Sequence, residues 1–124
     1  MNRGDAATVE ATWAAGGRWH VGQRTMAGRP EIMAFWKEIM APYESRIVQV
    51  VGQGQVQTAH DDVVGRWTFL EFARKSGRDT DHVEVGCYAD RYIQENGEWC
   101  FAERRIAIGY RNQITPGDFC GFPR

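Results

Sequence analysis

Three side chains that could do chemistry, Tyr88, Asp90 and Tyr92, are spaced two residues apart in the second half of the chain. Side chains two positions apart on a β-strand share one face, so these three would line one surface of a sheet. A carboxyl group beside aromatic rings loses solvation, which raises its pKa toward the range useful for proton transfer. A phenol can donate a hydrogen bond to an oxygen that gains charge during a reaction. We therefore predict Asp90 as a catalytic acid or base and Tyr88 as an orienting donor.

The reaction that suits such a pair is removal of a proton next to a carbonyl group. Isomerisation, dehydration and aldol-type cyclisation of a hydrophobic carbonyl compound belong to this class. Aromatic side chains on neighbouring segments would form the walls of a pocket for such a small molecule. The predicted substrate-binding residues are Trp67, Phe69, Glu71, Tyr92, Phe101 and Arg105.

A predicted hairpin sets the register of these residues. Asn96-Gly97 is the strongest short-range hairpin signal in the sequence, because this dipeptide favours a two-residue turn. Counting back from the turn places Tyr92 near Phe101 and Tyr88 near Arg105. A β-bulge would shift these pairs by one residue.

The same pattern also suits a structural role for the carboxylates. Asp90 and Glu103 could form a cross-strand charge network on a solvated face, with Asp90 holding Arg104 or Arg105. An Asp90 enclosed in an apolar cavity would indicate an enzyme. An Asp90 paired with an arginine would instead indicate a non-catalytic module for ligand binding or oligomeric assembly. The sequence leaves both functions open.

Histidine and cysteine form no recognisable metal motif. The histidines are His20, His60 and His82, and the cysteines are Cys87, Cys100 and Cys120. The odd cysteine count without a CxxC spacing predicts buried free thiols rather than disulfides. His82 follows two aspartates and is expected in a solvated loop. Since no nucleotide-binding loop occurs either, we expect no metal ion and no cofactor.

Composition narrows the classes of partner. The chain has 124 residues, a length typical of one domain, with 15 basic and 16 acidic residues and a net charge of -1. That balance argues against nucleic acid or an anionic membrane as the main partner. The N-terminal residues contain no long apolar run, so no signal peptide or membrane span is predicted and a cytoplasmic location is expected.

The expected elements are one main helix and several strands. Pro30 begins a helix whose apolar stripe is Ile32, Phe35, Trp36, Ile39 and Met40, and Pro42 ends it. A short strand is expected at 5–13, broken by Gly16-Gly17, with a second around Trp19. Further strands are expected at 46–51, 63–73, 82–94 and 98–108, with 55–59 continuing or re-pairing the first of these. This order predicts an α+β fold in which the helix packs on a curved antiparallel sheet. The small aliphatic face that carries Val85, Cys87 and Ala89 is expected under the helix.

Two stretches of the sequence resemble a known family. They are GRWTFLEF at 65–72 and VGCYADRYIQENGEWCFAERR at 85–105. Their order of motifs is similar to that of the SnoaL-like branch of the nuclear-transport-factor-two-like superfamily, over roughly residues 8–110. The shared pattern is a W…E strand, a G-x-Y-x-D-x-Y strand, an Asn-Gly hairpin and a W-x-F-A-x-R strand.

The resemblance implies a cone-shaped sheet around a ligand cavity, commonly in a homodimer. Relatives include ketosteroid isomerases, scytalone dehydratase, limonene epoxide hydrolase and polyketide cyclases, beside many binding modules. In some of them the aspartate that matches Asp90 is the acid or base of the cavity. The long N-terminal helix of the family is expected to be missing here. The expected single domain covers residues 1–124, with 111–124 as a C-terminal tail. This tail would either be loose or dock Phe119 and Phe122 across the mouth of the cone or onto a partner chain.

Overall fold

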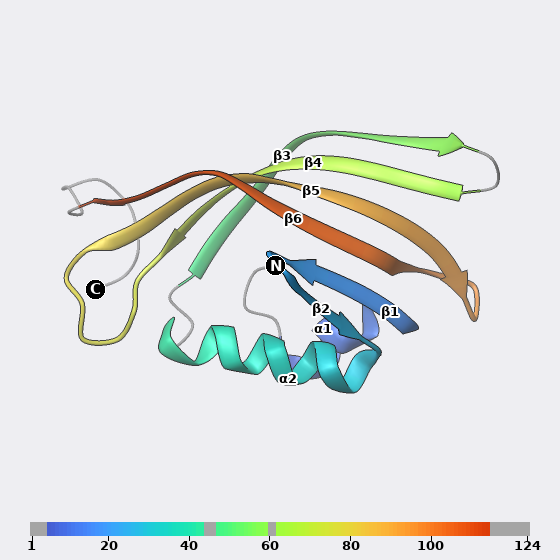
Figure 1. The fold of residues 1–124 in the computed structure, drawn as a ribbon, viewed down its shortest axis with the longest axis horizontal. Coiled ribbons are helices and arrows are strands. Elements are labelled where there is room, and N and C mark those ends of the chain that lie inside the picture. The colour runs from blue at the N-terminus through green and yellow to red at the C-terminus, as the bar shows by residue number, and fades with distance from the viewer. Residues whose placement is uncertain (1–4, 44–46, 60–61, 115–124) are drawn as a thin grey trace.

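The computed structural model describes residues 5–43, 47–59 and 62–114 (Figure 1). Its elements are α1 (Ala6–Ala11), β1 (Trp13–Val21), β2 (Arg24–Ala27), α2 (Arg29–Met40), a 3-10 turn η1 (Ala41–Tyr43), β3 (Ile47–Ala59), β4 (Asp62–Ala73), β5 (Asp81–Glu95) and β6 (Glu98–Ile114).

The strands form one curved sheet in the order β2-β1-β6-β5-β4-β3. All neighbouring strands are antiparallel except β1 and β6, which run parallel. Figure 1 shows that β3–β6 arch over the helix α2, while β1 and β2 lie between the arch and the helix. This is the expected α+β fold, with one main helix on the concave side of an open sheet.

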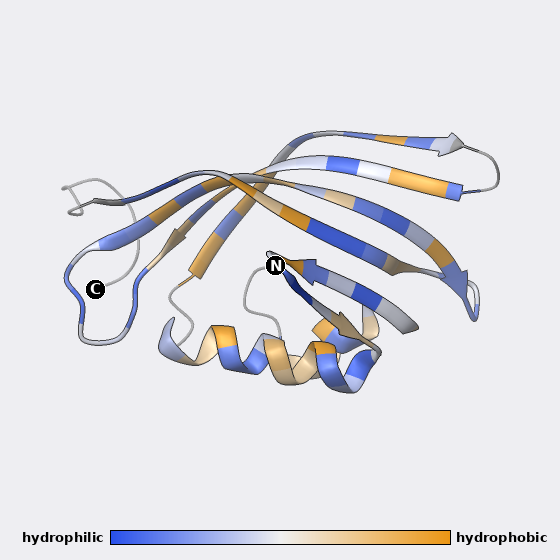
Figure 2. Cartoon of the chain, in the orientation of Figure 1, coloured by the Kyte–Doolittle hydropathy of each residue, from blue (hydrophilic) through white to orange (hydrophobic). Residues whose placement is uncertain are grey.

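Helix α2 begins where the sequence predicts. Pro30 lies in the first turn, where the missing N–H costs no hydrogen bond, and Gly28 precedes the helix at φ 84°. Most of the predicted stripe is buried, and Ile32 is fully enclosed. Ile39, at the other end, is 37% exposed. Apolar and polar bands alternate along α2 and along the strands in Figure 2, as expected for elements with one covered face.

The core lies where α2 meets the N-terminal strands. Trp19 of β1 packs edge-on against Phe35 of α2 at 5.2 Å between ring centroids, and Trp13 lies 5.6 Å from Trp19. Trp13 is completely buried. Each large apolar side chain buried in this way contributes about 1.5–3 kcal/mol relative to an exposed one.

The N-terminal prediction is wrong in its secondary structure. Residues 6–11 form the helix α1, because Asp5 caps it by accepting a hydrogen bond from the backbone N–H of Thr8 at 2.7 Å. Gly16-Gly17 does not break a strand either. It lies inside β1, where the pairing with β6 shifts register between Trp13 and Arg18.

The other predicted β-strands are confirmed, and the pairings among β3–β6 contain three bulges that the sequence does not reveal. Asn96 and Gly97 form the hairpin turn at φ 53° and 80°. β3 does not end at Gly52 but continues with a register shift between Val51 and Gly54. The other two lie in β6, one between Phe101 and Glu103 and one between Ile108 and Tyr110.

The bulge between Phe101 and Glu103 changes which residues face Asp90. Tyr92 pairs with Phe101 as predicted, but the register then shifts, so that Asp90 pairs with Arg104 and Tyr88 with Ile106. Arg105 pairs with Ala89 and therefore lies on the opposite face of the sheet. The predicted position of Arg105 beside Tyr88 is thus wrong. Arg104, and not Arg105, lies on the same face of the sheet as Tyr88 and Asp90.

The prediction of which face of the sheet lies under the helix is also wrong. The concave face carries Phe69 and Tyr88, whereas Cys87, on the face expected under the helix, is exposed. Large rings on the concave face offer more apolar area than the small aliphatic side chains do, so the helix covers the rings. β4 and β5 slide by two residues from the expected register, with Glu71 opposite Glu84, which leaves every side chain on its predicted face.

The C-terminal tail was expected to begin at residue 111. Residues 111–114 instead belong to β6, which continues through Ile114 and pairs with β5. Phe119 and Phe122 lie outside the described residues. Ahead of β1, the described part of the chain contains only the six-residue α1, so no long N-terminal helix occurs in that part. Within the described residues, no helix is long and apolar enough to cross a membrane.

Candidate functional site

A cavity of about 630 Å³ lies between α2 and the concave face of the sheet. Its walls are mostly apolar, and the larger side chains are Trp19, Phe35, Trp36, Met40, Ile106 and Ile108. Polar groups enter from β3, β4, β5 and β6: Gln49, Glu71, His82, Glu84, Tyr88 and Arg111. Apolar walls with a few convergent polar groups are typical of sites for small organic ligands.

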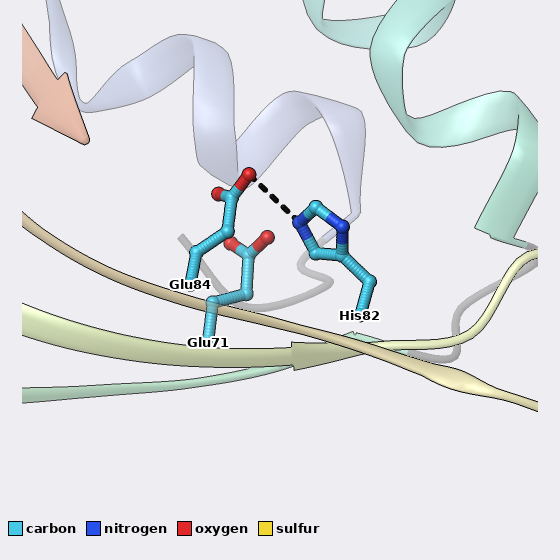
Figure 3. Close-up of side chains that lie close together, drawn as sticks. All are labelled: Glu71, His82 and Glu84. Atoms are coloured by element: carbon cyan, nitrogen blue, oxygen red, sulfur yellow. Dashed lines mark ion pairs between the residues drawn. The ribbon is translucent and has the colours of Figure 1, made fainter. Parts of the chain in front are cut away.

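Glu71, His82 and Glu84 gather at one end of this cavity (Figure 3). Glu71 and Glu84 are directly opposite each other on β4 and β5, and His82 lies two positions before Glu84 on the same face. The nearest ligand-type atoms of the three side chains lie within 4.8 Å of one another. His82 Nε2 is 2.7 Å from Glu84 Oε1, which also accepts a hydrogen bond from Arg111 Nε at 2.6 Å.

A hydrogen-bonded chain leads from the middle of the cavity to Glu71. The Tyr88 hydroxyl donates to Gln49 Oε1 at 3.1 Å, and Gln49 Nε2 donates to Glu71 Oε2 at 3.0 Å. Burial raises the pKa of the Glu71 carboxyl, and the neighbouring Glu84 carboxylate raises it further. Burial also raises the pKa of Tyr88. The cavity therefore presents an uncharged phenol beside an amide and a close carboxyl pair.

Asp90 lies in the sheet and does not line this cavity. Its side chain is fully buried and accepts two hydrogen bonds from Arg104, Nε to Oδ1 at 2.7 Å and an amino group of the guanidinium to Oδ2 at 2.9 Å. Tyr92 donates a further hydrogen bond to Oδ2 at 3.0 Å. The Arg104 guanidinium in turn stacks over the ring of Tyr88, 3.7 Å from its centroid. Asp90 thus has the arginine partner that the sequence indicated as the structural alternative.

The predicted aromatic residues support the sheet more than they line the cavity. Phe69 stacks on Tyr88 at 4.6 Å between centroids, and Trp67 Nε1 donates to the Tyr92 hydroxyl at 2.7 Å. Phe101 packs between Trp13 and Tyr92. Of the predicted site residues, the cavity brings together Glu71 and Tyr88.

His82 and Glu84 were missed as site residues, although a signal was present. Both have the even numbering of Tyr88 and Asp90 on the same predicted strand, so a period of two already placed them on that face. His82 was expected in a solvated loop, and this was wrong, since it lies half-buried in β5. Gln49 could not be placed from the sequence, because β3 joins the site only through its pairing with β4.

The remaining histidine and cysteine predictions have mixed outcomes. Cys100 is a buried free thiol as expected, but Cys87 is exposed. His20 lies outside the cavity, with Nε2 2.5 Å from Glu103 Oε1. His60 and Cys120 lie outside the described residues.

Comparison with known proteins agrees with the fold. A family model described as a SnoaL-like domain matches residues 1–105. No curated protein matches the sequence. The fold is similar to that of hexachlorocyclohexane dehydrochlorinase LinA type 2, with a TM-score of 0.80 and 14% identity over 94% of this chain and 80% of that chain.

Two further crystal structures are similar, both of proteins from Novosphingobium aromaticivorans. A putative scytalone dehydratase has a TM-score of 0.77 and 13% identity over 93% of this chain and 81% of its own. A putative aromatic ring hydroxylase has a TM-score of 0.78 and 12% identity over 90% and 80%. At such identities the likeness concerns the fold alone, whereas the family match covers most of the sequence. The chain belongs to the SnoaL-like domain family, as the motifs at 65–72 and 85–105 indicated.

Proposed function

We propose that the protein binds a small, mostly apolar molecule in the cavity beneath the sheet. One observation carries this proposal: mostly apolar walls line a space of about 630 Å³, and the polar groups converge on it from neighbouring strands. Similar folds in a dehydrochlorinase and a putative scytalone dehydratase support a domain of the ligand-binding or enzyme type.

The polar end of the cavity favours ligands that donate hydrogen bonds. Glu71 and Glu84 offer carboxylate oxygens, which accept hydrogen bonds when ionised. Among the described residues, none donates to Oε1 of Glu71 or to Oε2 of Glu84. A hydroxyl or amine on the ligand would satisfy these oxygens, whereas a lone ether or ketone oxygen would not.

The expected proton transfer by Asp90 on a carbonyl compound stays a prediction, and so do the homodimer and the cytoplasmic location. Arg104 and Tyr92 already occupy both carboxylate oxygens of Asp90. We therefore favour ligand binding over catalysis by Asp90, with Asp90 and Tyr92 as supports of the cavity wall through Arg104 and Tyr88.

Calorimetric titration with three related probes tests the proposal. 2-Naphthol carries one hydroxyl donor, 2-methoxynaphthalene has lost the donor, and naphthalene has only the apolar rings. We expect 2-naphthol to bind at least about tenfold more tightly than the other two, equivalent to one net hydrogen bond to a charged group. The metal chelator EDTA is present throughout, so that only the protein's own groups are measured.

A cavity-filling variant locates the binding. Ile106→Trp places a large ring in the cavity and should abolish binding of 2-naphthol, whereas Val48→Trp changes an exposed side chain that does not line the cavity. Equal binding by the wild type and Ile106→Trp would rule out this site.

A further inference from the structure

We propose that Glu71, His82 and Glu84 form a binding site for a divalent transition-metal ion, held by two carboxylates and one imidazole at the polar end of the cavity. The sequence shows no such motif, because the ligands come from two strands and meet only through the pairing of β4 with β5. This inference goes beyond the binding of an organic ligand and does not depend on it.

The distances suit a metal ion after small side-chain movements. Metal–ligand bonds of about 2.0–2.2 Å place two ligand atoms roughly 3–3.5 Å apart around one ion. The nearest donor atoms of the three side chains already lie within 4.8 Å of one another, and His82 Nε2 is 2.7 Å from Glu84 Oε1. Small rotations of the two glutamate side chains would open the space for an ion.

The charge at this end of the cavity favours a cation. Two carboxylates face each other across neighbouring strands, and Arg111 is the one described arginine in contact with them. Arg111 pairs with Glu84 alone, and its side chain is 61% exposed. Among the described residues, no lysine or arginine lies within ion-pair distance of Glu71. Two like charges held together in a half-buried site repel each other, and a divalent ion would relieve that repulsion.

Neighbouring residues already orient the proposed ligands while leaving donor atoms available. Gln49 Nε2 holds one oxygen of Glu71, and Arg111 Nε holds one oxygen of Glu84. The other oxygen of each carboxylate accepts no hydrogen bond from a described residue. Hydrogen bonds of this kind to ligating side chains are a regular feature of protein metal sites.

The mixture of donors selects the class of metal. An imidazole suits Zn²⁺, Fe²⁺ and other transition ions, while carboxylates suit Mn²⁺ as well. Mg²⁺ and Ca²⁺ prefer oxygen ligands and would gain little from His82. Three protein ligands leave further positions open, and these would face the cavity, where a hydroxyl or amine of a ligand could coordinate the ion.

Titration with Mn²⁺ tests the site without any organic ligand. The electron paramagnetic resonance signal of free Mn²⁺ gives the number bound, and we expect one ion per chain that Zn²⁺ displaces and Ca²⁺ does not. Glu71→Gln and His82→Gln should each weaken Mn²⁺ binding at least about tenfold, since even changes to supporting residues cost that much in known sites. The metal-free Glu71→Gln protein should melt at or above the wild-type temperature, because the variant removes repulsion from Glu84.

Glu103→Gln is the matched control. Glu103 also contacts a histidine, His20, but it does not belong to the cluster of Glu71, His82 and Glu84. Glu103→Gln changes the net charge by the same amount as Glu71→Gln. It should bind Mn²⁺ like the wild type. Equal loss in all three variants, or no loss in His82→Gln, would overturn the proposal.

A measurement on the wild type covers the case in which a variant fails to fold. Substoichiometric Mn²⁺ should broaden the amide NMR signals of residues 71, 82 and 84 before any others. Broadening that begins elsewhere in the chain, or the absence of any broadening, would refute the site.

Discussion

Arg104 holds Asp90 through two hydrogen bonds of 2.7 and 2.9 Å, and neither side chain is more than 8% exposed. The same guanidinium lies over the rings of Tyr88 and Phe101, at 3.7 and 4.2 Å from their centroids. One buried ion pair therefore connects β5 and β6 behind the cavity wall. The contacts of this ion pair indicate a structural role for Asp90 and Arg104.

Removal of one partner of this pair should destabilise the fold. Asp90→Asn leaves Arg104 with an uncompensated buried charge, and breaking a buried pair in this way costs about 3–5 kcal/mol. Urea denaturation would measure the loss. The double variant Asp90→Leu with Arg104→Met should be more stable than Asp90→Asn, because no charge stays buried. Wild-type stability for Asp90→Asn would contradict the structural role of the pair.

The buried tyrosines should make the protein sensitive to alkaline pH. Burial raises the pKa of Tyr88 and of Tyr92 in the folded state above the value of about 10 for an unfolded chain. Their contribution to stability is therefore present below pH 10 and is lost as the pH rises through the folded pKa. Urea denaturation at several pH values up to 11 should show this decline.

Tyr92→Phe should make the decline above pH 10 less steep, although the variant loses the hydrogen bonds to Trp67 and Asp90 at every pH. The same slope in both proteins would exclude Tyr92 as a cause.

Gly86 is a position where a side chain should not be tolerated. An added Cβ would clash with the backbone oxygen of Ala107 and would lie 2.7 Å from Cζ of Phe69, whose ring stacks on Tyr88. Overpacking of this kind costs about 1–3 kcal/mol, so Gly86→Ala should lower the melting temperature. Gly109→Ala is the control, because its nearest neighbour would be 3.6 Å away. An equal effect of both variants would mean that only the loss of glycine matters.

The predicted homodimer has a candidate surface on the outer face of the sheet. Four side chains form a row across β3, β4, β5 and β6: Val50, Leu70, Val85 and Tyr110. Val50 and Tyr110 are 54% and 52% exposed. Light scattering should give twice the mass of one chain for the wild type and a single-chain mass for Val50→Asp.

Val56→Asp provides the comparison for this surface, since Val56 is equally exposed on the same strand but belongs to the opposite face. Dissociation by both variants, or a wild-type protein of single-chain mass, would contradict this interface.

The sequence predicts the fold well because its strongest signals are local. Pro30 and the apolar stripe after it define α2, and Asn96-Gly97 defines the last hairpin. The face shared by Glu71 and Tyr88 follows from a period of two, which survives even the two-residue slide between β4 and β5.

The errors come from features that carry no local signal. The bulge in β6 after Phe101 needs no special residue type, yet it exchanges Arg105 for Arg104 beside Asp90. Helix α2 packs on the concave face because aromatic side chains from β1, β4 and β5 lie there together. The cluster of Glu71, His82 and Glu84 depends on the pairing of β4 with β5. Neither the face covered by α2 nor this cluster could therefore be derived from one segment alone.

The central claim is that the space between α2 and the sheet receives a small molecule, and NMR with 2-naphthol tests it most directly. Nuclear Overhauser contacts between the naphthol protons and the protein would locate the ligand. The account predicts contacts to the methyl groups of Met40, Ile106 and Ile108, all of which line the cavity. Contacts confined to Val50 and Tyr110 on the outer face, or no contacts at saturating ligand, would contradict it.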